Sequence, residues 1–339
     1  MTSRWCRIFL LCCLQVSPLA AAAAGLAPSG PAWDTGDGLP FKKKVRLAVS
    51  GIACPQQPEA GARCLLAVDE GVLAPFIVLG DKAFAADETA VSLLEGEGEL
   101  DAEGAATDGD FFYVTGSHAV KRGNCKVNPD SRHVLRLRRD ASTGGVLRNS
   151  NGDPANRVDQ ADLESVLAGF PALQHAFGGC LGADGGLDIE GLAVTADRLY
   201  FGFRGPATDG KASILSVDKT KFFEGRPADP VLSEVALGAG RGIRDLQSVD
   251  GGLLILAGPD DVPSDAGFAI GFWPGVGEAK TLAQLDLSGI KLGHHGKCED
   301  EEVKPEALAL LDETGAQFRV LVLSDGLCDG GPMVFEVPR

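Results

Sequence analysis

The fold is decided by a stretch that recurs along the chain, and its clearest copy is EGLAVTADRLYFGF at residues 190–203. The copy opens with a polar residue, a glycine, an apolar residue and an alanine. A short turn follows, and the copy ends in the apolar run Leu199–Phe203, which is rich in residues that favour β-strands. Two apolar segments joined by a short turn predict an antiparallel strand pair.

Five copies of this unit can be counted in the sequence. In chain order, the copies and the apolar run that follows each are Ser50–Ala53 with Cys64–Val68, Glu103–Ala106 with Phe111–Gly116, Glu190–Ala193 with Leu199–Phe203, Arg244–Gln247 with Leu253–Ala257, and Glu306–Ala309 with Arg319–Leu323. The steps between successive copies are 53, 87, 54 and 62 residues. Repeats at intervals of roughly 40–50 residues, each made of short strands, are typical of the blades of a β-propeller.

The long second step predicts an insertion. Residues 158–175 carry apolar side chains at helical spacing, at Leu163, Val166, Leu167 and Phe170, behind an aspartate that can cap a helix. We therefore expect one helical insertion here. A degenerate sixth blade hidden in the same step is the alternative.

Each unit holds further strand-like segments bounded by Gly, Pro or Asp, such as Ile214–Val217 and Ala269–Trp273. After the last copy only one more such segment follows, Met333–Val337. We expect Val45–Val49 to supply the missing fourth strand of that blade, because an N-terminal strand would close the ring and remove its exposed edges. The predicted fold is an all-β propeller of five, or alternatively six, four-stranded blades. Tandem β-sandwiches would explain the strands but not the closure.

The N-terminus has the features of a secretory signal peptide. Two arginines precede an apolar run over residues 8–16 that is too short to span a bilayer, and an alanine run follows. We expect residues 1–24 to be a cleaved signal, 25–40 a lead-in segment and 41–339 a single propeller domain. The protein is then exported, to the periplasm or the extracellular space.

The chain is strongly acidic, with 31 Lys and Arg against 47 Asp and Glu and a formal net charge of −16. Such a chain repels phosphate backbones and anionic lipid, which argues against nucleic acid as a partner. No segment after the signal peptide is apolar for long enough to span a membrane. We expect a monomer, and the acidity also suits calcium or another divalent cation as a cofactor.

Six cysteines follow the signal peptide, and an even number in an exported chain predicts up to three disulfides. They are Cys54, Cys64, Cys125, Cys180, Cys298 and Cys328. The sequence does not determine their connectivity, and the most economical hypothesis pairs neighbours in order. A zinc site is a poor alternative, because no pair has C-x-x-C spacing.

In a propeller blade the innermost strand lines the channel and pairs with the second strand, so the start of one lies beside the end of the other at one mouth. Strand starts place there Glu103, Glu190, Arg244 and Glu306, with Arg241 and Asp245 adjacent. Strand ends place there Asp69, His118, Arg204, Asp260 and Asp325. A concave opening with a few converging polar groups is a usual ligand site.

Two functions fit this predicted mouth. The first is non-catalytic binding of a small anionic or polar ligand, held by bidentate arginine contacts, or of a protein partner. The alternative is a metal-dependent hydrolase of phosphate or carboxylate esters, with Glu103, Glu190 and Glu306 as metal ligands or bases. A structural interpretation, in which Glu–Arg pairs link neighbouring blades, is equally physical. His118 is a candidate general base, but a single His at a strand end is more often a turn residue.

Four segments carry a family resemblance: FYVTGSH at 112–118, GLDIEGLA at 186–193, FRGP at 203–206 and RGIRDL at 241–246. Together they resemble the bacterial domain-of-unknown-function family 3616, over nearly all of the chain after the signal peptide. The resemblance implies a propeller-like protein without an assigned activity. The D-x-E-G-L-A element is also similar to exported phytase-like or esterase-like propeller proteins. The last copy departs from the pattern, with Ala307 where a glycine is expected.

Overall fold

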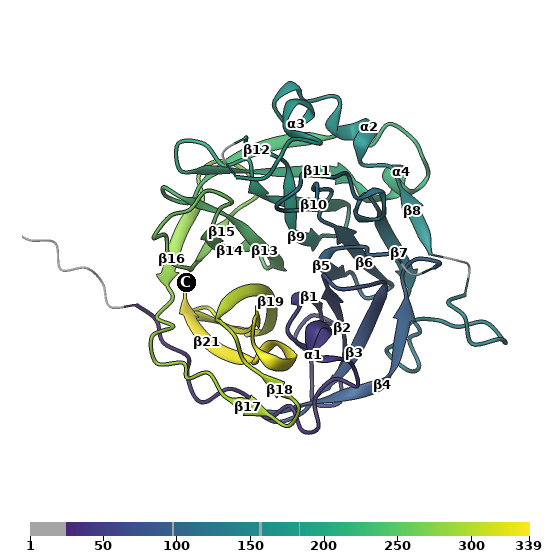
Figure 1. Ribbon diagram of the computed structural model, residues 1–339, viewed down its shortest axis with the longest axis vertical. Coiled ribbons are helices and arrows are strands. Elements are labelled where there is room, and N and C mark those ends of the chain that lie inside the picture. The colour runs from purple at the N-terminus through teal and green to yellow at the C-terminus, as the bar shows by residue number, and fades with distance from the viewer. Residues whose placement is uncertain (1–24, 97, 156–157, 183) are drawn as a thin grey trace, which may run out of the picture.

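The computed structural model describes residues 25–96, 98–155, 158–182 and 184–339, so the predicted signal peptide lies outside the described residues. Within this part of the chain, antiparallel sheets are arranged around a central axis (Figure 1). The innermost strands of successive sheets contact one another, and the last contacts the first. The described residues therefore form a closed β-propeller of five blades, which confirms the predicted fold.

Four blades contain four strands each, in chain order from the axis outward. They are β1 (Val49–Ala53), β2 (Arg63–Val68), β3 (Leu73–Leu79) and β4 (Phe84–Ser92); β5 (Ala102–Thr107), β6 (Phe111–Gly116), β7 (Val134–Arg138) and β8 (Asp159–Ala161); β9 (Asp188–Val194), β10 (Arg198–Gly205), β11 (Lys211–Asp218) and β12 (Val231–Ala236); and β13 (Arg241–Val249), β14 (Gly252–Pro259), β15 (Ala269–Trp273) and β16 (Lys280–Gln284). The fifth sheet consists of β19 (Lys304–Glu313), β20 (Gln317–Asp325) and β21 (Met333–Pro338), preceded by the small pair β17 (His294–His295) and β18 (Cys298–Glu299).

The recurring sequence unit is the inner hairpin of each blade. Its polar start lies in β1, β5, β9, β13 or β19, and the apolar run that follows lies in the adjacent second strand. Start and end meet as expected, for example at the pair Ala102 and Gly116 in the second blade. The predicted placement of both strand ends at one mouth is therefore correct.

The long second step contains both strand and helix. Its residues 158–175 begin with β8, the outer strand of the second blade, and continue with α2 (Glu164–Leu167) and α3 (Pro171–Ala176). The strand is three residues long, too short to show an alternating pattern, so helical spacing dominated the prediction. Among the described residues, the sheet outside the five blades is the two-stranded pair of β17 and β18, so a sixth blade is absent there. Helix α4 (Lys219–Phe223) and the 3₁₀ turns η1 (Pro129–Ser131) and η2 (Cys328–Gly330) lie in other connections.

The N-terminal part of the chain closes the ring, but Val45–Val49 was the wrong segment. These residues cover the end of helix α1 (Lys43–Arg46) and the first residue of β1, and they are apolar because Val45 and Val49 pack into the core between the first and fifth blades. The lead-in segment instead crosses the outer edges of three blades. Its backbone hydrogen bonds include Leu26 N to Gln284 O at 2.7 Å, Ser29 N to Val334 O at 2.8 Å and Phe84 N to Asp34 O at 2.9 Å.

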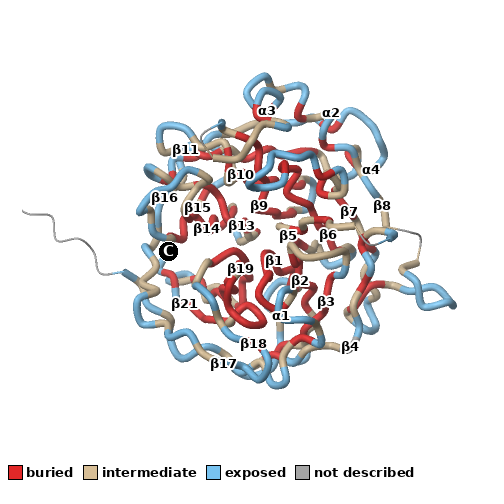
Figure 2. Tube along the Cα trace, viewed as in Figure 1, coloured by how far each residue is buried: buried red, intermediate tan, exposed pale blue. Residues whose placement is uncertain are grey.

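The inner strands are buried, whereas the loops and outer strands carry most of the exposed surface (Figure 2). Strand β9 is buried along its whole length, because neighbouring blades cover both of its faces. The glycine after the polar start allows this close packing. A Cβ at Gly104 would lie 2.7 Å from Leu192 Cβ, and one at Gly191 would lie 2.9 Å from Ile243 Cγ2, so side chains at these positions would push the blades apart.

Three disulfides join the six cysteines in the predicted order. They are Cys54–Cys64, Cys125–Cys180 and Cys298–Cys328. Neighbour pairing is correct because each pair closes a local loop within or beside one blade. Across the described ranges, none of the helices has the length and apolar character that crossing a membrane requires.

Candidate functional site

One residue of every inner strand is displaced from its strand ladder. Near the start of each inner strand, pairing with the second strand of the blade skips one residue, which makes a β-bulge. The skipped residues are Ser50, Glu103, Glu190, Arg244 and Glu306, the polar starts of the sequence repeat. Because a bulge re-aims a side chain, each blade turns one polar group toward the channel.

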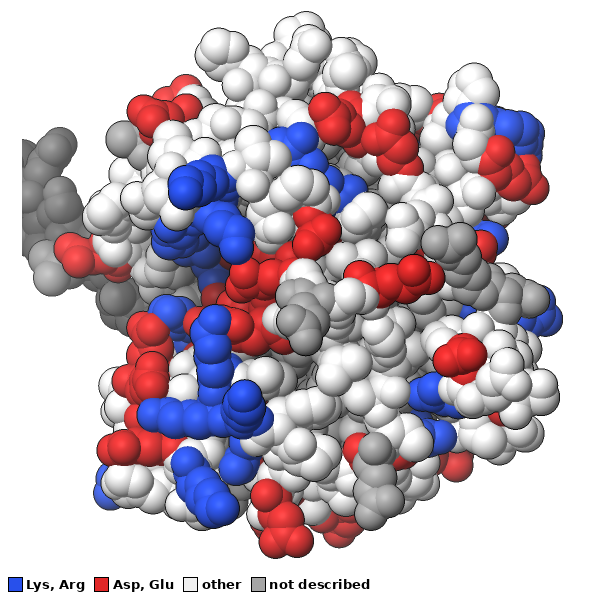
Figure 3. Space-filling model, turned by 45° about the vertical axis from the view of Figure 1, so that its right-hand side comes forward, with Lys and Arg blue, Asp and Glu red and all other residues white. Residues whose placement is uncertain are grey.

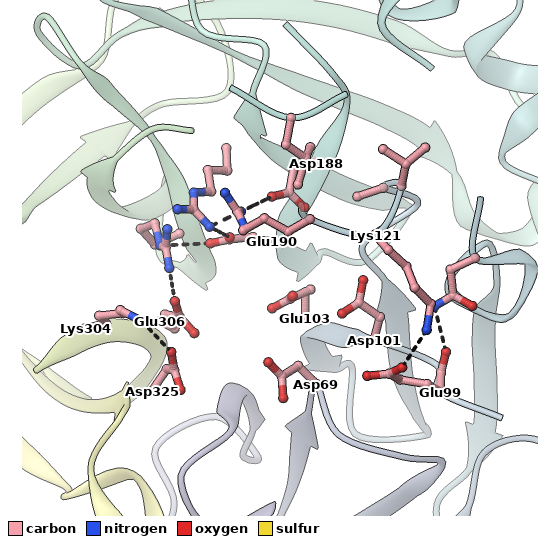
Figure 4. A pocket seen from close by; sticks show the side chains of 17 residues that line it. Asp69, Glu99, Asp101, Glu103, Lys121, Asp188, Glu190, Lys304, Glu306 and Asp325 are labelled. Atoms are coloured by element: carbon pink, nitrogen blue, oxygen red, sulfur yellow. Dashed lines mark hydrogen bonds and ion pairs between the residues drawn. The ribbon is translucent and has the colours of Figure 1, made fainter. Parts of the chain in front are cut away.

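These bulges surround a cavity of about 510 Å³ at one mouth of the channel (Figure 4). Eight carboxylates and five cationic side chains line it. The acidic residues are Asp69, Glu99, Asp101, Glu103, Asp188, Glu190, Glu306 and Asp325, and the basic residues are Lys121, Arg122, Arg204, Arg244 and Lys304. The cavity has the volume of a small-molecule site and an excess of negative charge.

The charges on the side of blades three to five are paired. Glu190 Oε1 accepts a hydrogen bond from Arg204 Nη1 at 2.8 Å, and Glu190 Oε2 lies 2.8 Å from Arg244 Nε. Arg244 Nη2 donates to Glu306. We call Asp188, Glu190, Arg204, Arg244 and Glu306 the paired arc. Arg244 is 2% exposed, so its cation is buried between the two glutamates.

Burial and charge act against each other in the paired arc. Burial raises the pKa of Asp188, Asp261 and Glu190 raise it further, and Arg204 opposes them. Burial lowers the pKa of Arg204, but the attraction of the surrounding carboxylates outweighs burial and leaves that pKa raised. The arc is therefore a network that depends on both signs of charge being present.

Three carboxylates on the side of blades one and two are not paired with a cation. Asp69 follows β2, Asp101 precedes β5, and Glu103 occupies the bulge of β5. Among the described residues, none of these three carboxylates lies within ion-pair distance of a cation, although Asp101 accepts a hydrogen bond from Ser117 Oγ. We call Asp69, Asp101 and Glu103 the open arc. Figure 4 shows them facing the cavity without a partner between them and its centre.

The open arc favours the protonated form of its carboxyl groups. Burial, together with the nearby Asp325, raises the pKa of Asp69 to about 8. Burial and the charge of Glu190 raise the pKa of Glu103 well above its usual range. Burial also raises the pKa of Asp101, against the hydrogen bond from Ser117. A cation in the cavity would relieve the same repulsion that these protons relieve.

Two further ion pairs complete the rim. Lys121 Nζ lies 3.0 Å from Glu99 Oε2, and Lys304 Nζ lies 3.2 Å from Asp325 Oδ2. In the space-filling view, acidic side chains gather near the middle of the visible face, with a group of basic side chains to their left (Figure 3). The mouth thus presents a divided charge pattern.

Asp245 does not line this cavity. It is fully buried, and its two carboxyl oxygens accept the backbone N–H groups of Leu246 and Leu308, each at 2.7 Å. Leu308 belongs to β19, so the Asp245 side chain links the fourth blade to the fifth. Burial raises the pKa of this carboxyl, while its backbone hydrogen bonds oppose the shift.

His118, Arg241 and Asp260 also lie outside the cavity. His118 is fully buried, neither ring nitrogen has a hydrogen-bond partner, and burial lowers its pKa to about 3. Arg241 donates to the carbonyl oxygen of Gly267 at 2.8 Å on the outer side of its blade. Asp260 lines a smaller neighbouring cavity. The sequence pattern correctly placed these residues near the strand ends at this mouth. It could not show which way each side chain points.

The predicted metal ligands do not converge on a free position. Arg244 contacts both Glu190 and Glu306, so these two glutamates already share a cation, and only Glu103 is left without one. In the part of the chain that the structure describes, no group of three or more His, Cys, Asp or Glu side chains is arranged to hold a metal ion. Calcium binding at the mouth stays a prediction.

Beyond the mouth the channel is nearly filled. A constriction of about 20 Å³ is lined by small and apolar residues such as Ala105, Leu192 and Leu246. A second cavity of about 560 Å³ lies at the other end, where Lys219 pairs with Asp108 at 2.7 Å. A ligand in the mouth would therefore be stopped by a packed floor and would not pass through the channel.

A family model described as "Protein of unknown function (DUF3616)" matches residues 69–143 and 155–329. The chain belongs to this family. The match includes the open arc, the paired arc and four of the five inner hairpins, and it confirms the family resemblance seen in the sequence. Comparison with curated protein sequences gives no match for this DUF3616 protein.

Several solved structures are similar to this chain at low identity. A GH43 beta-1,3-galactosidase is 8% identical with a TM-score of 0.46, and the match covers 93% of this chain but 60% of the galactosidase. An endo-arabinase from Bacteroides thetaiotaomicron VPI-5482 is 11% identical with a TM-score of 0.41, covering 87% of this chain and 96% of that one. A GH43 endo-arabinanase from Bacillus licheniformis is 12% identical with a TM-score of 0.36, covering 90% and 96%. Likeness at this level carries no argument about activity.

The cavity of this DUF3616 protein also contains residues that were not assigned to the mouth from the sequence. Asp101 and Asp188 stand two positions before Glu103 and Glu190, and Lys304 stands two before Glu306. A charged residue two positions before each of the three glutamates was the signal that could have found them, since alternate residues of a strand share a face. Glu99, Lys121 and Arg122 lie in loops, where no periodic signal exists.

Proposed function

We propose that this protein binds a small organic cation, an ammonium or guanidinium compound, at the charged mouth of the propeller. One observation carries the proposal. The three carboxylates of the open arc face a cavity of about 510 Å³ without an ion-pair partner, while the buried arginines of the paired arc are engaged by carboxylates. The cavity therefore lacks a positive charge that would balance these three carboxylates.

The same geometry disfavours an anionic ligand. Arg204 and Arg244 were the expected anion clamps, but a phosphate or carboxylate would have to displace Glu190 from both guanidinium groups. Removing one partner of a buried ion pair costs roughly 3–5 kcal/mol. An anion would also approach the negative charge of the open arc. A cation pays neither cost.

Binding should be coupled to proton release. The raised pKa values mean that the open arc holds protons near neutral pH, and Asp69 titrates at about 8. A bound ammonium group would favour the ionised carboxylates and displace these protons. Each hydrogen bond from a charged donor contributes about 1.5–3 kcal/mol. Affinity should therefore rise as the pH rises toward 8.

The test is isothermal titration calorimetry with butylamine, guanidinium chloride, calcium chloride with and without a chelator, and inorganic phosphate. We expect the two organic cations to bind, to bind more tightly at higher pH, and to lose about tenfold or more in affinity in Glu103→Gln, as the loss of one charged hydrogen bond predicts. Glu313→Gln, which changes a glutamate at the opposite mouth, is the matched control. Binding of phosphate alone, or cation binding that Glu103→Gln leaves unchanged, would overturn the proposal. Calcium binding sensitive to the chelator would replace the organic cation by a metal.

Ester hydrolysis is the second candidate function, and one pair of residues favours it. Glu103 has a raised pKa and no partner, whereas Glu190 is held by two arginines, an arrangement in which one carboxyl can donate a proton while the other accepts one. Glu103 would protonate the leaving oxygen as water attacks the ester, and Glu190 would take the proton of that water. Chromogenic phosphate and carboxylate esters, assayed with and without calcium, test this. Turnover that persists in both Glu103→Gln and Glu190→Gln would place the chemistry elsewhere.

We also assign this binding to an exported protein. Three disulfides suit an oxidising compartment, since thiols in the cytosol are kept reduced. Fractionation of cells that express the full chain, followed by mass measurement of the purified protein, tests export. Loss of residues 1–24 is the expected result, and an uncleaved cytosolic product would contradict it.

A further inference from the structure

A smaller cavity of about 230 Å³, distinct from the one at the opposite end of the channel, adjoins the mouth on the side of blades three and four. Its walls are four glycines with Pro206, Ala207, Thr208 and Val262, and its acidic residues are Asp260 and Asp261. No lysine or arginine lines it among the described residues. We call this space the side cavity. Because glycine walls carry no side chains, the cavity is open to the backbone and to the two aspartates.

Asp261 carries an oxygen that has no partner. Its side chain is 4% exposed, and its Oδ1 accepts a hydrogen bond from Arg122 Nη2 at 2.8 Å and lies 3.3 Å from Arg204 Nε. Its Oδ2 is buried without any hydrogen bond. A Cβ added at Gly205, which lines the side cavity, would lie 2.7 Å from this Oδ2. A buried acceptor left unsatisfied costs about 1–3 kcal/mol, which a donor entering the side cavity would recover.

The side cavity and the mouth are separated by one guanidinium group. Arg204 contacts Glu190 of the mouth through Nη1 and Asp261 of the side cavity through Nε. Leu181 lines the mouth, and the next residue, Gly182, lines the side cavity. Arg122 also contacts Asp261, and its side chain is 56% exposed, so it lies at the surface between the two spaces. The two cavities are therefore neighbours, with Arg204 in contact with an acidic residue of each.

We propose that the side cavity is a second subsite, and that the ligand is a small molecule with two amino groups, one in the open arc and one on Asp261. This rests on the function proposed above and names the class of ligand more closely. Joining two weak sites by a linker that spans them raises affinity without new contacts, by up to about 10²–10⁴-fold. The glycine walls accommodate the aliphatic linker, and the unpartnered Oδ2 accepts from the distal ammonium group.

The test compares butylamine with a series of α,ω-diamines of increasing length by calorimetry on the full-length protein. The readout is the ratio of the monoamine to the diamine dissociation constant within one variant, so a general loss of affinity does not count. We expect one diamine length to bind about tenfold or more tighter than butylamine. Asp261→Asn, which turns the orphan acceptor into a donor, should bring this ratio close to one. Asp265→Asn, an exposed aspartate of the same loop, should leave it unchanged.

Ala207→Leu provides a second variant in case Asp261→Asn does not fold, because it fills the side cavity and leaves residue 261 unchanged. A diamine advantage that survives both variants, or the absence of any advantage at all lengths, would overturn the second subsite. If butylamine itself does not bind, or binds without dependence on Glu103, the proposed function of the mouth has failed instead.

Discussion

The two arcs of the mouth both depend on a β-bulge in the inner strand of each blade. They differ in charge, because among the described residues the carboxylates of the paired arc contact arginines and those of the open arc contact no cation. In every blade a bulge turns one side chain of the inner strand toward the channel. In the paired arc the blade between two glutamates supplies Arg244, and the three groups form one buried network. In the open arc the neighbouring blade supplies Ser50, so Glu103 faces the cavity without a cation. A single change of residue type at equivalent positions thus separates a buried ion-pair network from a set of unpaired carboxylates.

Removal of Arg244 should have the largest effect. Arg244→Ala leaves Glu190 and Glu306 buried without their shared cation, which costs about 3–5 kcal/mol in the free energy of unfolding. Urea denaturation measures it. Lys304→Ala is the control at the rim of the same cavity, because the Lys304 side chain is 40% exposed, and its loss should be at most about 1 kcal/mol. Equal losses in the two variants would show that the paired arc is not a buried network.

Packing beneath the two arcs should be equally tight. Gly104→Ala, at the open arc, and Gly191→Ala, at the paired arc, each place a methyl group within 3 Å of the next blade, and we expect each to lose about 1–3 kcal/mol. Gly315→Ala, in an open turn, is the matched control and should be nearly neutral. If only one of the two inner glycines is sensitive, the arcs differ in packing as well as in charge.

Neutralising one glutamate in each arc should change stability in opposite directions. Glu103→Gln removes a repelled carboxylate from the open arc and should stabilise the protein above neutral pH, because burial and the charge of Glu190 raise the pKa of Glu103 well above its usual range. Glu190→Gln removes a partner of two arginines and should destabilise it. Urea denaturation of both variants measures the two changes in the free energy of unfolding. Changes of the same sign would show that the two arcs do not differ in this way.

The pH dependence of stability also tests the open arc. The pKa of Asp69 is raised from 3.8 to about 8 in the folded state, so the native protein binds this proton more tightly than the unfolded chain does. Stability from this group is fully present below about pH 4 and is lost as the pH rises toward 8. Calorimetric melting across this range should show a Tm that depends less on pH in Asp69→Asn than in the unchanged protein. Superimposable profiles would mean that Asp69 titrates normally.

Much of this architecture was predictable from the sequence because it depends on local patterns. The inner hairpins follow from apolar strands, short turns and the glycines that let blades approach, and the disulfides follow from neighbouring cysteines. The closing segment was not predictable. The lead-in segment joins the outer edges by backbone hydrogen bonds of Leu26, Ser29 and Asp34, which leave no periodic signal, whereas Val45–Val49 is apolar only because it packs into the core.

The sequence by itself predicted the propeller fold and the polar residue that starts each repeat, and it left five or six blades open. Only the tertiary structure decided which of these residues form ion pairs. Glu103, Glu190 and Glu306 look equivalent in the sequence, because each opens a repeat before an apolar strand. Their difference depends on the residue that the adjacent blade turns toward them, which is fixed by closure of the ring. That contact joins residues about one blade apart or more in the chain, and local pattern carries no information about it.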